Sequence, residues 1–326
     1  MMGMLQAAIS YSLHTSGGIF MYYFIINPNS RSGKGAEIWK QLQNILDRKK
    51  VSYKAYFTSY RGHAISISEE ITSQAGSPVN LIAVGGDGTI QEVLTGIKDL
   101  SSVRFGYIPT GSGNDFCRSM KLPQDPAEAL DIILSGHKIS DIDIPFITYK
   151  NDRSRFAISC GIGFDAAVCH EVGITPMKKV LNKIGLGKLV YLFVALKQLL
   201  FLTPSPVTLD MDGRNESFSK VYFVAVMNQK YEGGGFKFCP KASPSDGILD
   251  VIVVDSLPKF KVLLCLPTAF FGKHTIFKGI HIFQCKNITV NSKVALPVHK
   301  DGESGGIHKS FSVSVEPQKL SIFLPL

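Results

Sequence analysis

One pattern recurs three times in the first half of the chain: a short apolar run ends in a glycine-rich loop, and a helix-like pattern follows. Its sharpest form is LIAVGGDGTIQEVLTG at residues 81–96, where three glycines surround Asp87. The other two loops are NPNSRSGKG at 27–35 and PTGSGNDF at 109–116. Short apolar strands that alternate with helices form parallel sheets with helices on both faces. Because ligands bind at the carboxyl edge of such sheets, we expect the three loops there.

The alternation predicts a domain boundary near residues 140–145. Strands are expected in MYYFII, VSYKAYFT, VNLIAV and RFGYIP. Helices are expected between successive strands, one of them at 63–75, and after the last strand at 126–136. Later runs are strand-like, with a hairpin signal at Asp212-Gly213 and one long helical segment at about 176–203. We predict an α/β domain of residues 21–142 closed by 308–326, and a mainly antiparallel, sandwich-like β domain of 143–307. Residues 1–20 resemble no signal peptide and are expected to be a leader or tail outside the fold.

The residue types in the glycine loops indicate phosphate chemistry. Glycines at strand ends let backbone N–H groups approach a phosphate, and the start of the next helix adds positive potential. Asp87 would repel a bare phosphate, so it suits a residue that holds Mg²⁺ or accepts a proton in phosphoryl transfer. The loop 27–35 lacks the P-loop spacing. Taken alone, it is as typical of a plain loop as of a phosphate cradle, and 109–116 is as typical of a capped helix start.

The charge distribution indicates an anionic partner. The chain carries 35 basic and 26 acidic residues, a formal charge of +9, and the stretches 172–209 and 256–300 contain lysines but no acids. Such stretches favour a membrane surface or nucleic acid, and no nucleic-acid motif supports the second. In the first stretch, Lys178, Lys179 and Lys183 are predicted to dock on anionic lipid beside an apolar helical face. Its longest apolar run, 189–196, is far shorter than the roughly 18 residues that span a bilayer.

Cysteine and histidine spacing favours no metal site. The six cysteines form no C-x-x-C pair and are typical of reduced thiols in a cytosolic protein. No two of the eight histidines stand at metal-ligand spacing.

Taken together, GGDGT, NPNSRSGKG and PTGSGNDF resemble the catalytic domain of the diacylglycerol kinase family, which includes sphingosine and ceramide kinases. GIGFDA at 161–166, NQKYEGGGFKFCPKASPSDGILDV at 228–251 and DGE at 301–303 follow in the family's order. The resemblance covers residues 21–326. It is closest to the soluble bacterial lipid kinases, since no C1-type cysteine module is present. GGDG also occurs in NAD kinases and phosphofructokinases, but the later motifs do not.

The resemblance implies a nucleotide site and two metal sites. The nucleotide residues would be Asn27, Pro28, Ser30, Ser32, Gly33, Lys34, Thr58, Gly85, Gly86, Gly88, Thr89, Glu92 and Ser112, with His63 nearby. Asp87, Asn114, Asp115 and Asp165 would form a polar network around a catalytic Mg²⁺. A second, structural Mg²⁺ would bind the Asp246 side chain and the carbonyls of Leu249 and Val251. From the residues alone, SDGIL is a turn that enters a strand.

The resemblance also implies the catalytic base. In the family the DGE position supplies it, so Asp301 is the candidate and Glu303 its partner, while Asp87 remains a rival as in sphingosine kinases. A proline-containing segment is more usual where this chain has ESGGIHKS, which leaves the local backbone open.

The expected function is an ATP-dependent lipid kinase that binds peripherally to the inner face of the membrane, and a homodimer is one candidate assembly. Diacylglycerol is the first substrate to test, giving phosphatidic acid, with phosphatidylglycerol or a sphingoid base as alternatives. A non-catalytic nucleotide- or lipid-binding module of the same fold is the competing hypothesis, against which Asp87, Asp115, Asp246 and Asp301 argue together.

Overall fold

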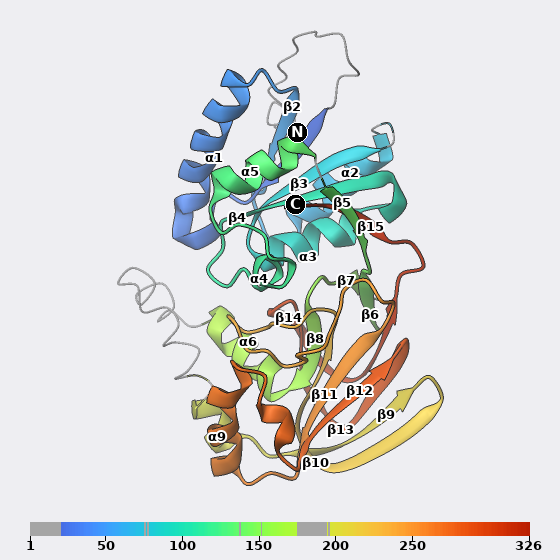
Figure 1. Cartoon of the computed structure of the whole chain (residues 1–326). Coiled ribbons are helices and arrows are strands. Elements are labelled where there is room, and N and C mark those ends of the chain that lie inside the picture. Colours follow the sequence, from blue (N-terminus) through green and yellow to red (C-terminus); the bar gives the residue numbers. More distant parts are fainter. Residues whose placement is uncertain are drawn as a thin grey trace, which may run out of the picture. The chain divides into compact units, whose positions relative to one another are not determined.

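The computed structural model of the chain describes residues 21–74, 76, 78–136, 138–150, 152–174, 194 and 196–326. These residues form two compact units (Figure 1). The first contains the described residues up to Ser112, then Lys121–Asp141 and Gln318–Leu326. The second contains Gly113–Met120 and Ile142–Pro317. Residues 308–317, which we predicted for the first domain, thus lie in the second unit, and so does the short segment 113–120.

The first unit is built on a parallel sheet, as the alternation predicts. Its strand order is β2-β1-β3-β4-β15-β5 over the described residues. The strands are β1 (Tyr22–Ile26), β2 (Tyr53–Phe57), β3 (Val79–Gly85), β4 (Val103–Pro109), β5 (Lys138–Ile142) and β15 (Leu320–Leu324). β1 pairs in parallel with β2 and β3, and β4 pairs in parallel with β3 and β15. Every residue of β3 is buried, which matches a strand covered on both faces.

Helices cover both faces of this sheet (Figure 1). α1 (Ser30–Arg48) and α5 (Pro126–Ser135) pack on one face, where Trp39, Leu42 and Leu130 join Phe24 and Ile82 in one apolar cluster. α2 (His63–Gln74) and α3 (Asp87–Gly96) cover the other. In α3, Ile90, Val93 and Leu94 recur at helical spacing and are buried, so the sequence pattern alone sets the side that faces the sheet. A single 3-10 turn, η1 (Leu100–Ser102), precedes β4.

The second unit is built on antiparallel strands. They are β6 (Pro145–Tyr149), β7 (Asp152–Arg155), β8 (Ser159–Gly163), β9 (Ser205–Met211), β10 (Arg214–Met227), β11 (Leu249–Asp255), β12 (Ile280–Cys285), β13 (Asn287–Lys300) and β14 (Glu303–Val315). Their order is β12-β11-β10-β8-β13-β14-β6-β7, and β9 also pairs with both β10 and β13. β14 pairs with β13 and β6, which explains why residues 308–317 belong to this unit.

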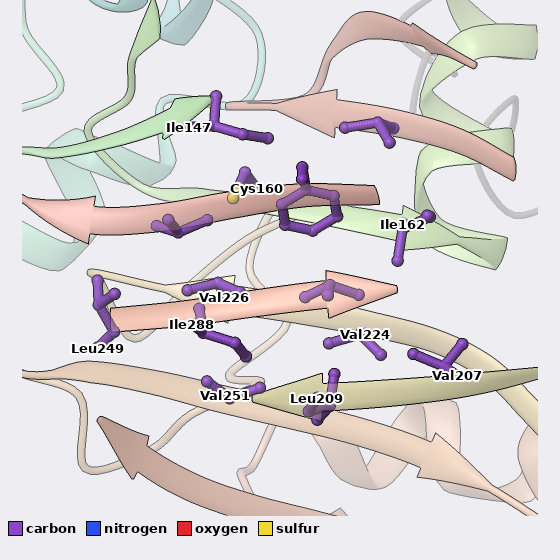
Figure 2. Packing of buried hydrophobic residues seen from close by; sticks show 14 of the residues in the cluster. Ile147, Cys160, Ile162, Val207, Leu209, Val224, Val226, Leu249, Val251 and Ile288 are labelled. Atoms are coloured by element: carbon purple, nitrogen blue, oxygen red, sulfur yellow. The ribbon is translucent and has the colours of Figure 1, made fainter. Parts of the chain in front are cut away.

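Two long strands fold this sheet around a core. The first part of β10 pairs with β9, and its last part pairs with β8 and β11. β13 likewise pairs with β9 through residues 288–292 and with β8 through residues 298–300. Side chains from β6, β8, β9, β10, β11 and β13 therefore face one another in one apolar cluster, shown in Figure 2 by Ile147, Ile162, Leu209, Val226, Val251 and Ile288, among others. This is the sandwich-like arrangement that we predicted.

Helices pack on the outer face of β10 and β11. α6 (Phe164–Ile174), residues 196–201 and α9 (Lys259–Ala269) contribute Phe164, Leu199 and Val262 to a second cluster with Phe223 and Ile252. A 3-10 turn, η2 (His274–Ile276), follows α9, and the short helix α4 (Asp115–Met120) also belongs to this unit. Within the described ranges, no helix has both the length and the hydropathy needed to cross a bilayer.

Several sequence predictions need correction, and others concern residues that the structure does not describe. Two of the later strand-like runs are each divided. IHIFQCKNITV contains β12 and the start of β13, and KISDIDIPFITY contains β5 of the first sheet and β6 of the second. We did not predict α6 and α9. Of the predicted helix at 176–203, residues 194 and 196–201 are helical. Lys178, Lys179 and Lys183 lie outside the described residues, as does the predicted leader or tail of residues 1–20.

Candidate active site

Three loops meet at the carboxyl edge of the first sheet. The backbone N–H of Asn27, just after β1, donates to the carbonyl of Val84 over 2.9 Å. The N–H of Thr110, just after β4, donates to the carbonyl of Gly85 over 2.7 Å. The hydroxyls of Ser30 and Thr110 lie 2.6 Å apart in a buried hydrogen bond. The loops after β1, β3 and β4 are thus fastened to one another, as the parallel sheet requires.

Gly85, the last residue of β3, and Gly86, which follows it, differ in the space around them. A Cβ on Gly85 would collide with the side chain of Thr89, so Gly85 lets the first turn of α3 lie against the strand end. A Cβ on Gly86 would have only the Cα of Gly111 near it, at 3.4 Å, which is an ordinary contact. Gly86 is the N-cap of α3 in extended conformation, and its carbonyl accepts from Thr89 and Ile90. The space next to Gly86 is therefore open to a ligand at a helix start.

The other predicted nucleotide residues lie in or beside the same loops and helix starts. Asp87 is the acid in the first turn of α3, and Asn27 donates from Nδ2 to the hydroxyl of Thr89 over 3.4 Å. Lys34 and Ser112 are exposed. Pro28 precedes α1, Gly33 lies in the first turns of α1, and Gly88 lies in α3. The N–H of Thr58 donates to the carbonyl of Ile26.

Glu92 has a structural partner that the sequence did not reveal. Its carboxylate accepts from the backbone N–H groups of Gly62 at 2.8 Å and Ala64 at 3.3 Å, and so holds the start of α2. Next to them, His63 stacks on Tyr60 and accepts at Nδ1 from the N–H of Ser59. Glu92 is therefore committed to shaping this loop.

The second unit contains a buried cluster of charged side chains. Asn114 and Asp115 are buried at the start of α4, where Asn114 adopts a left-handed conformation with φ 52°. The carboxylate of Asp115 pairs with Arg118 and accepts from the N–H of Gly234 over 2.7 Å. The glycine run 233–235 thus lets the chain approach Asp115 closely.

At the centre of this cluster, His299 lies between two carboxylates. Its Nε2 is 2.9 Å from Oδ2 of Asp165 and 3.2 Å from Oε1 of Glu232, and His299 is fully buried. Burial disfavours the charged imidazolium, but the carboxylates of Glu232 and Asp165 outweigh it and raise the pKa of His299. Burial raises the pKa of Glu232 as well, against the attraction of His299. The imidazolium therefore compensates charge that would otherwise be buried unpaired.

This cluster also has the chemistry of a cation site. One ligand atom from each of Asp165, Glu232 and His299 lies within 4.8 Å of the others. Among the described residues, Oε2 of Glu232 is buried with no hydrogen-bond partner. Carboxylate oxygens are the ligands that Mg²⁺ prefers, so Asp165 and Glu232 fit that ion, whereas the protonated Nε2 of His299 offers it no lone pair. A cation would compete for these carboxylates with the proton on His299.

Asp301 holds a loop of its own unit. It lies in the turn between β13 and β14 with φ 47°, and its side chain is buried. Oδ2 accepts from the N–H of Ala157 over 2.7 Å, and Oδ1 accepts from Ile158 at 2.7 Å and Ser159 at 3.0 Å. Burial raises the pKa of Asp301 to about 6, although the three N–H donors act to lower it. Oδ2 has one hydrogen bond and therefore keeps a second lone pair. Glu303, predicted as its partner, is exposed in β14.

The predicted structural metal site lies at the turn before β11. Asp246 is exposed and accepts from the N–H of Ile248, while Leu249 and Val251 lie in β11. The structure adds two neighbours: Asp143, which accepts from the N–H of Gly247 over 2.6 Å, and Asp250. Oδ2 of Asp250 is buried without a hydrogen-bond partner in the described part of the chain. Burial, and then the charge of Asp246, raise the pKa of Asp250 to about 6, as expected of an acid that lacks a counter-charge.

The structure therefore groups the predicted residues by unit. Asp87 and the predicted nucleotide residues, up to Ser112, lie in the first unit, and Asn114, Asp115, Asp165 and Asp301 lie in the second. Sequence reasoning missed Arg118, Glu232 and His299, because the spacing between histidines says nothing of the carboxylates beside His299. Its partners stand 67 and 134 residues away, which no spacing rule detects. The available signals were Glu232, directly before the glycines of YEGGGF, and His299, two positions before DGE.

Comparison with family models covers most of the chain. Residues 21–145 match the diacylglycerol kinase catalytic domain, and residues 159–324 match the YegS C-terminal NAD kinase beta sandwich-like domain. The "Putative lipid kinase YtlR" of Bacillus subtilis is 32% identical over 312 residues, which is 92% of this chain and 98% of that protein. A diacylglycerol kinase of Staphylococcus saprophyticus is 29% identical over 308 residues, 92% of this chain and 94% of its own.

Solved structures share the fold at lower identity. A crystal structure of "a putative diacylglycerol kinase from Bacillus anthracis" superposes with a TM-score of 0.73 at 23% identity, covering 97% of this chain and 99% of its own. An NAD kinase from Archaeoglobus fulgidus, solved in complex with ATP, superposes with a TM-score of 0.52 at 13% identity over 93% of both chains. These structures support the two-domain fold.

Proposed function

The chain belongs to the diacylglycerol kinase family of lipid kinases, and from this premise we propose that it transfers the γ-phosphoryl group of ATP to the hydroxyl of diacylglycerol, giving phosphatidic acid. Family membership supports phosphoryl transfer from ATP to a lipid alcohol. The choice of diacylglycerol is supported by relatives named diacylglycerol kinase, which this chain matches over most of their length. Phosphatidylglycerol and sphingoid bases are the alternative acceptors, since they also present a hydroxyl at a lipid surface.

The observation that carries this proposal is the joined set of glycine loops. Gly86 offers open space at the start of α3, and the loops after β1 and β4 are hydrogen-bonded to its neighbours. Backbone N–H groups and a helix start provide positive potential for the phosphates without a fixed charge. Lys34, exposed on α1, adds a mobile positive charge near the same loops. We assign ATP binding to this edge of the first unit.

Mg²⁺ is the proposed cofactor, and each unit offers carboxylates for it. In the first unit the acid is Asp87. In the second, Asp115 and Asp165 would hold the ion with Asn114, and Glu232 provides the unpartnered oxygen. Mg²⁺ neutralises charge on the phosphates when it is bound. A second ion is proposed at Asp246, where the buried Oδ2 of Asp250 has no hydrogen-bond partner among the described residues.

Asp301 is the proposed general base. Three backbone N–H groups fix its carboxylate, so it costs little reorganisation to accept a proton on the second lone pair of Oδ2. Burial raises the pKa of Asp301 to about 6, close to the pH at which a base is both deprotonated and a good acceptor. His299, two residues away, holds positive charge near it. Asp87 is the alternative base.

A transfer assay separates this function from a non-catalytic binding module. The protein is incubated with Mg²⁺, ATP and micelles of diacylglycerol, phosphatidylglycerol or sphingosine, and each lipid is examined for a new phosphate by mass spectrometry. We expect phosphorylation of diacylglycerol first, and none with Gly86→Asp. Binding of ATP without phosphorylation of any of the three lipids would support the module instead. Phosphorylation of another lipid alone would replace diacylglycerol as the substrate.

A further inference from the structure

The second unit exposes an unusual set of large apolar side chains. Leu200, Phe201, Phe260, Leu264, Phe271 and Ile276 are each between 62% and 79% exposed. They come from the end of the helical residues 196–201, from α9, from the segment between α9 and η2, and from η2. We call these six side chains the apolar face. Single exposed hydrophobic residues are normal, but a contiguous group of them marks a binding surface.

α9 differs from an ordinary surface helix in having apolar side chains on its exposed side as well as on its buried side. Val262, Cys265 and Ala269 recur at helical spacing and are buried against the sheet. The outward positions of an exposed helix are normally polar. Here Phe260 and Leu264 occupy them, so α9 is apolar on both sides. One side is covered by its own unit, and the other requires a non-aqueous neighbour.

The segments of the face are joined in the structure. The ammonium group of Lys259 donates to the carbonyl of Leu200 over 2.6 Å, and this bond links α9 to residues 196–201. Leu199 and Val262 lie in the same buried cluster. Figure 1 shows α9 at the periphery of the second unit. Four of the six side chains, Leu200, Phe201, Phe260 and Leu264, therefore stand on two helical segments that are joined to each other.

Basic residues surround this face, and acidic ones are absent from its chain segment. Residues 256–300 contain no Asp or Glu. Lys261, Lys273 and Lys278 are exposed on α9 and on either side of η2. Aromatic and aliphatic side chains with a lysine rim are what an interfacial element needs to enter the boundary of an anionic bilayer. A second copy of the chain fits less well, because a two-fold contact would bring the lysines of both copies together.

We propose that the apolar face inserts into an anionic phospholipid surface while Lys261, Lys273 and Lys278 contact the headgroups. This inference rests on the proposed function in one respect: a lipid kinase needs a place to meet the bilayer. The surface itself is assigned by exposure and charge.

The face is also connected to the charged cluster of the same unit. Phe270, next to Phe271, stacks on Phe236 with ring centroids 4.1 Å apart, and the carbonyl of Ala269 accepts from the N–H of Lys237. Phe236 pairs through its backbone with Glu232, whose carboxylate bonds to His299. Docking of the face would thus orient the loop 231–238, and with it Glu232, relative to the lipid surface.

Vesicle binding tests the proposal without requiring activity. Two variants change the face: Phe260→Ser/Leu264→Ser/Phe271→Ser, and Lys261→Glu/Lys273→Glu/Lys278→Glu. The controls are Ile307→Ser, at a side chain 65% exposed on β14, and Lys40→Glu/Lys50→Glu/Lys309→Glu, which makes the same change in net charge at other exposed sites. Each protein is sedimented with vesicles of phosphatidylglycerol and phosphatidylcholine, and with phosphatidylcholine vesicles alone. The oligomeric state is measured by sedimentation equilibrium without lipid.

We expect wild type to bind the anionic vesicles in a salt-sensitive way. The charge-reversed variant should lose about a hundredfold or more in affinity, since each lysine near an anionic surface contributes about fivefold. The apolar variant should lose at least about tenfold. Both controls should bind nearly as wild type does, and all variants should melt like wild type because the changed side chains are exposed.

Three results would overturn the proposal: no binding of wild type to anionic vesicles, wild-type affinity in both face variants, or a dimer that the face variants dissociate while vesicle binding is unchanged. The last result would make the face a contact between copies. Activity on a short-chain, water-soluble diacylglycerol separates this inference from the proposed function. If the face variants lose vesicle binding while even wild type phosphorylates no lipid, the docking surface stands and the kinase assignment fails.

Discussion

The carboxylate of Asp301 combines two roles, since it binds three backbone N–H groups and is the proposed base. Asp301→Asn places an amide N–H against one of these donors and should destabilise the fold by about 1–3 kcal/mol. Turnover should fall about a hundredfold or more, because the base is lost. The melting temperature is measured first, and ATP affinity and kcat are then measured well below it, with the exposed Asp152→Asn as control. Near-wild-type kcat in Asp301→Asn would move the base to Asp87.

The pH dependence of kcat/KM should reveal the same group. A base works when deprotonated, so activity should rise with pH through about 6, the value to which burial raises the pKa of Asp301. Glu232, with a raised pKa, also titrates in this region, so the variant is the deciding control. The rise near pH 6 should disappear from the residual rate of Asp301→Asn. An unchanged inflection in that variant would assign it to another group.

The contribution of the Asp301 carboxyl to folding stability should fall as pH rises, whereas its contribution to activity should increase. Its pKa is higher in the folded chain than in the unfolded one, so its favourable contribution is fully present below about pH 4 and is lost as pH rises through about 6. Urea unfolding of wild type and Asp301→Asn at pH 5 and pH 8 measures it. We expect the stability difference between wild type and variant to move in favour of the variant at the higher pH. A shift in favour of wild type would contradict the raised pKa.

Gly85 and Gly86 should respond differently to substitution. Gly86→Asp keeps the fold, because a Cβ has room beside Gly111, but it places a carboxylate where phosphate must bind. ATP affinity measured by calorimetry should become undetectable, whereas Gly86→Ala should retain most of it. Gly85→Ala should lower the melting temperature, since its Cβ would collide with Thr89. Unchanged ATP affinity in Gly86→Asp would rule out the glycine loop as the phosphate site.

At the scale of elements, the β9–β10 hairpin offers a test of local structure. Asp212 and Gly213 have φ of 52° and 87°, which is the two-residue turn that the sequence predicts. The carboxylate of Asp212 accepts from the N–H groups of Lys286 and Asn287, which mainly lower its pKa. Asp212→Asn should therefore lower the unfolding free energy by up to about 1 kcal/mol near neutral pH. The loss should shrink as acid protonates wild-type Asp212, and a loss that grows in acid would contradict this role.

Local pattern was enough for some elements and insufficient for others. The parallel strands and α3 follow from short apolar runs and helical spacing, because their burial is set by neighbours in sequence. α9 was missed because KFKVLLCLPTA is apolar on both sides and contains Pro267, so it shows no helical period. The boundary between β12 and β13 was missed because Lys286 alone separates the two strands, and no glycine or proline marks the turn. The His299 cluster depends on contacts between segments 67 and 134 residues apart, which only the folded sheet supplies.

At the scale of the whole molecule, the chain separates two kinds of chemistry. The first unit provides backbone N–H groups at strand ends, and the second provides buried carboxylates with His299 among them. The second unit alone carries the apolar face with its lysines. This division suits an enzyme that uses a soluble nucleotide and an acceptor held in a membrane. The resemblance of the motifs predicted the family, which the comparisons confirm.

We propose that this chain moves one phosphoryl group from ATP to diacylglycerol. The most direct measurement supplies ATP labelled in its γ-phosphate or, in a parallel reaction, in its α-phosphate, together with Mg²⁺ and diacylglycerol in mixed micelles. We predict that the γ-label appears in phosphatidic acid, that the α-label stays in the nucleotide, and that Gly86→Asp abolishes the transfer. Release of the γ-label as free phosphate, with no labelled phosphatidic acid, would contradict the assignment.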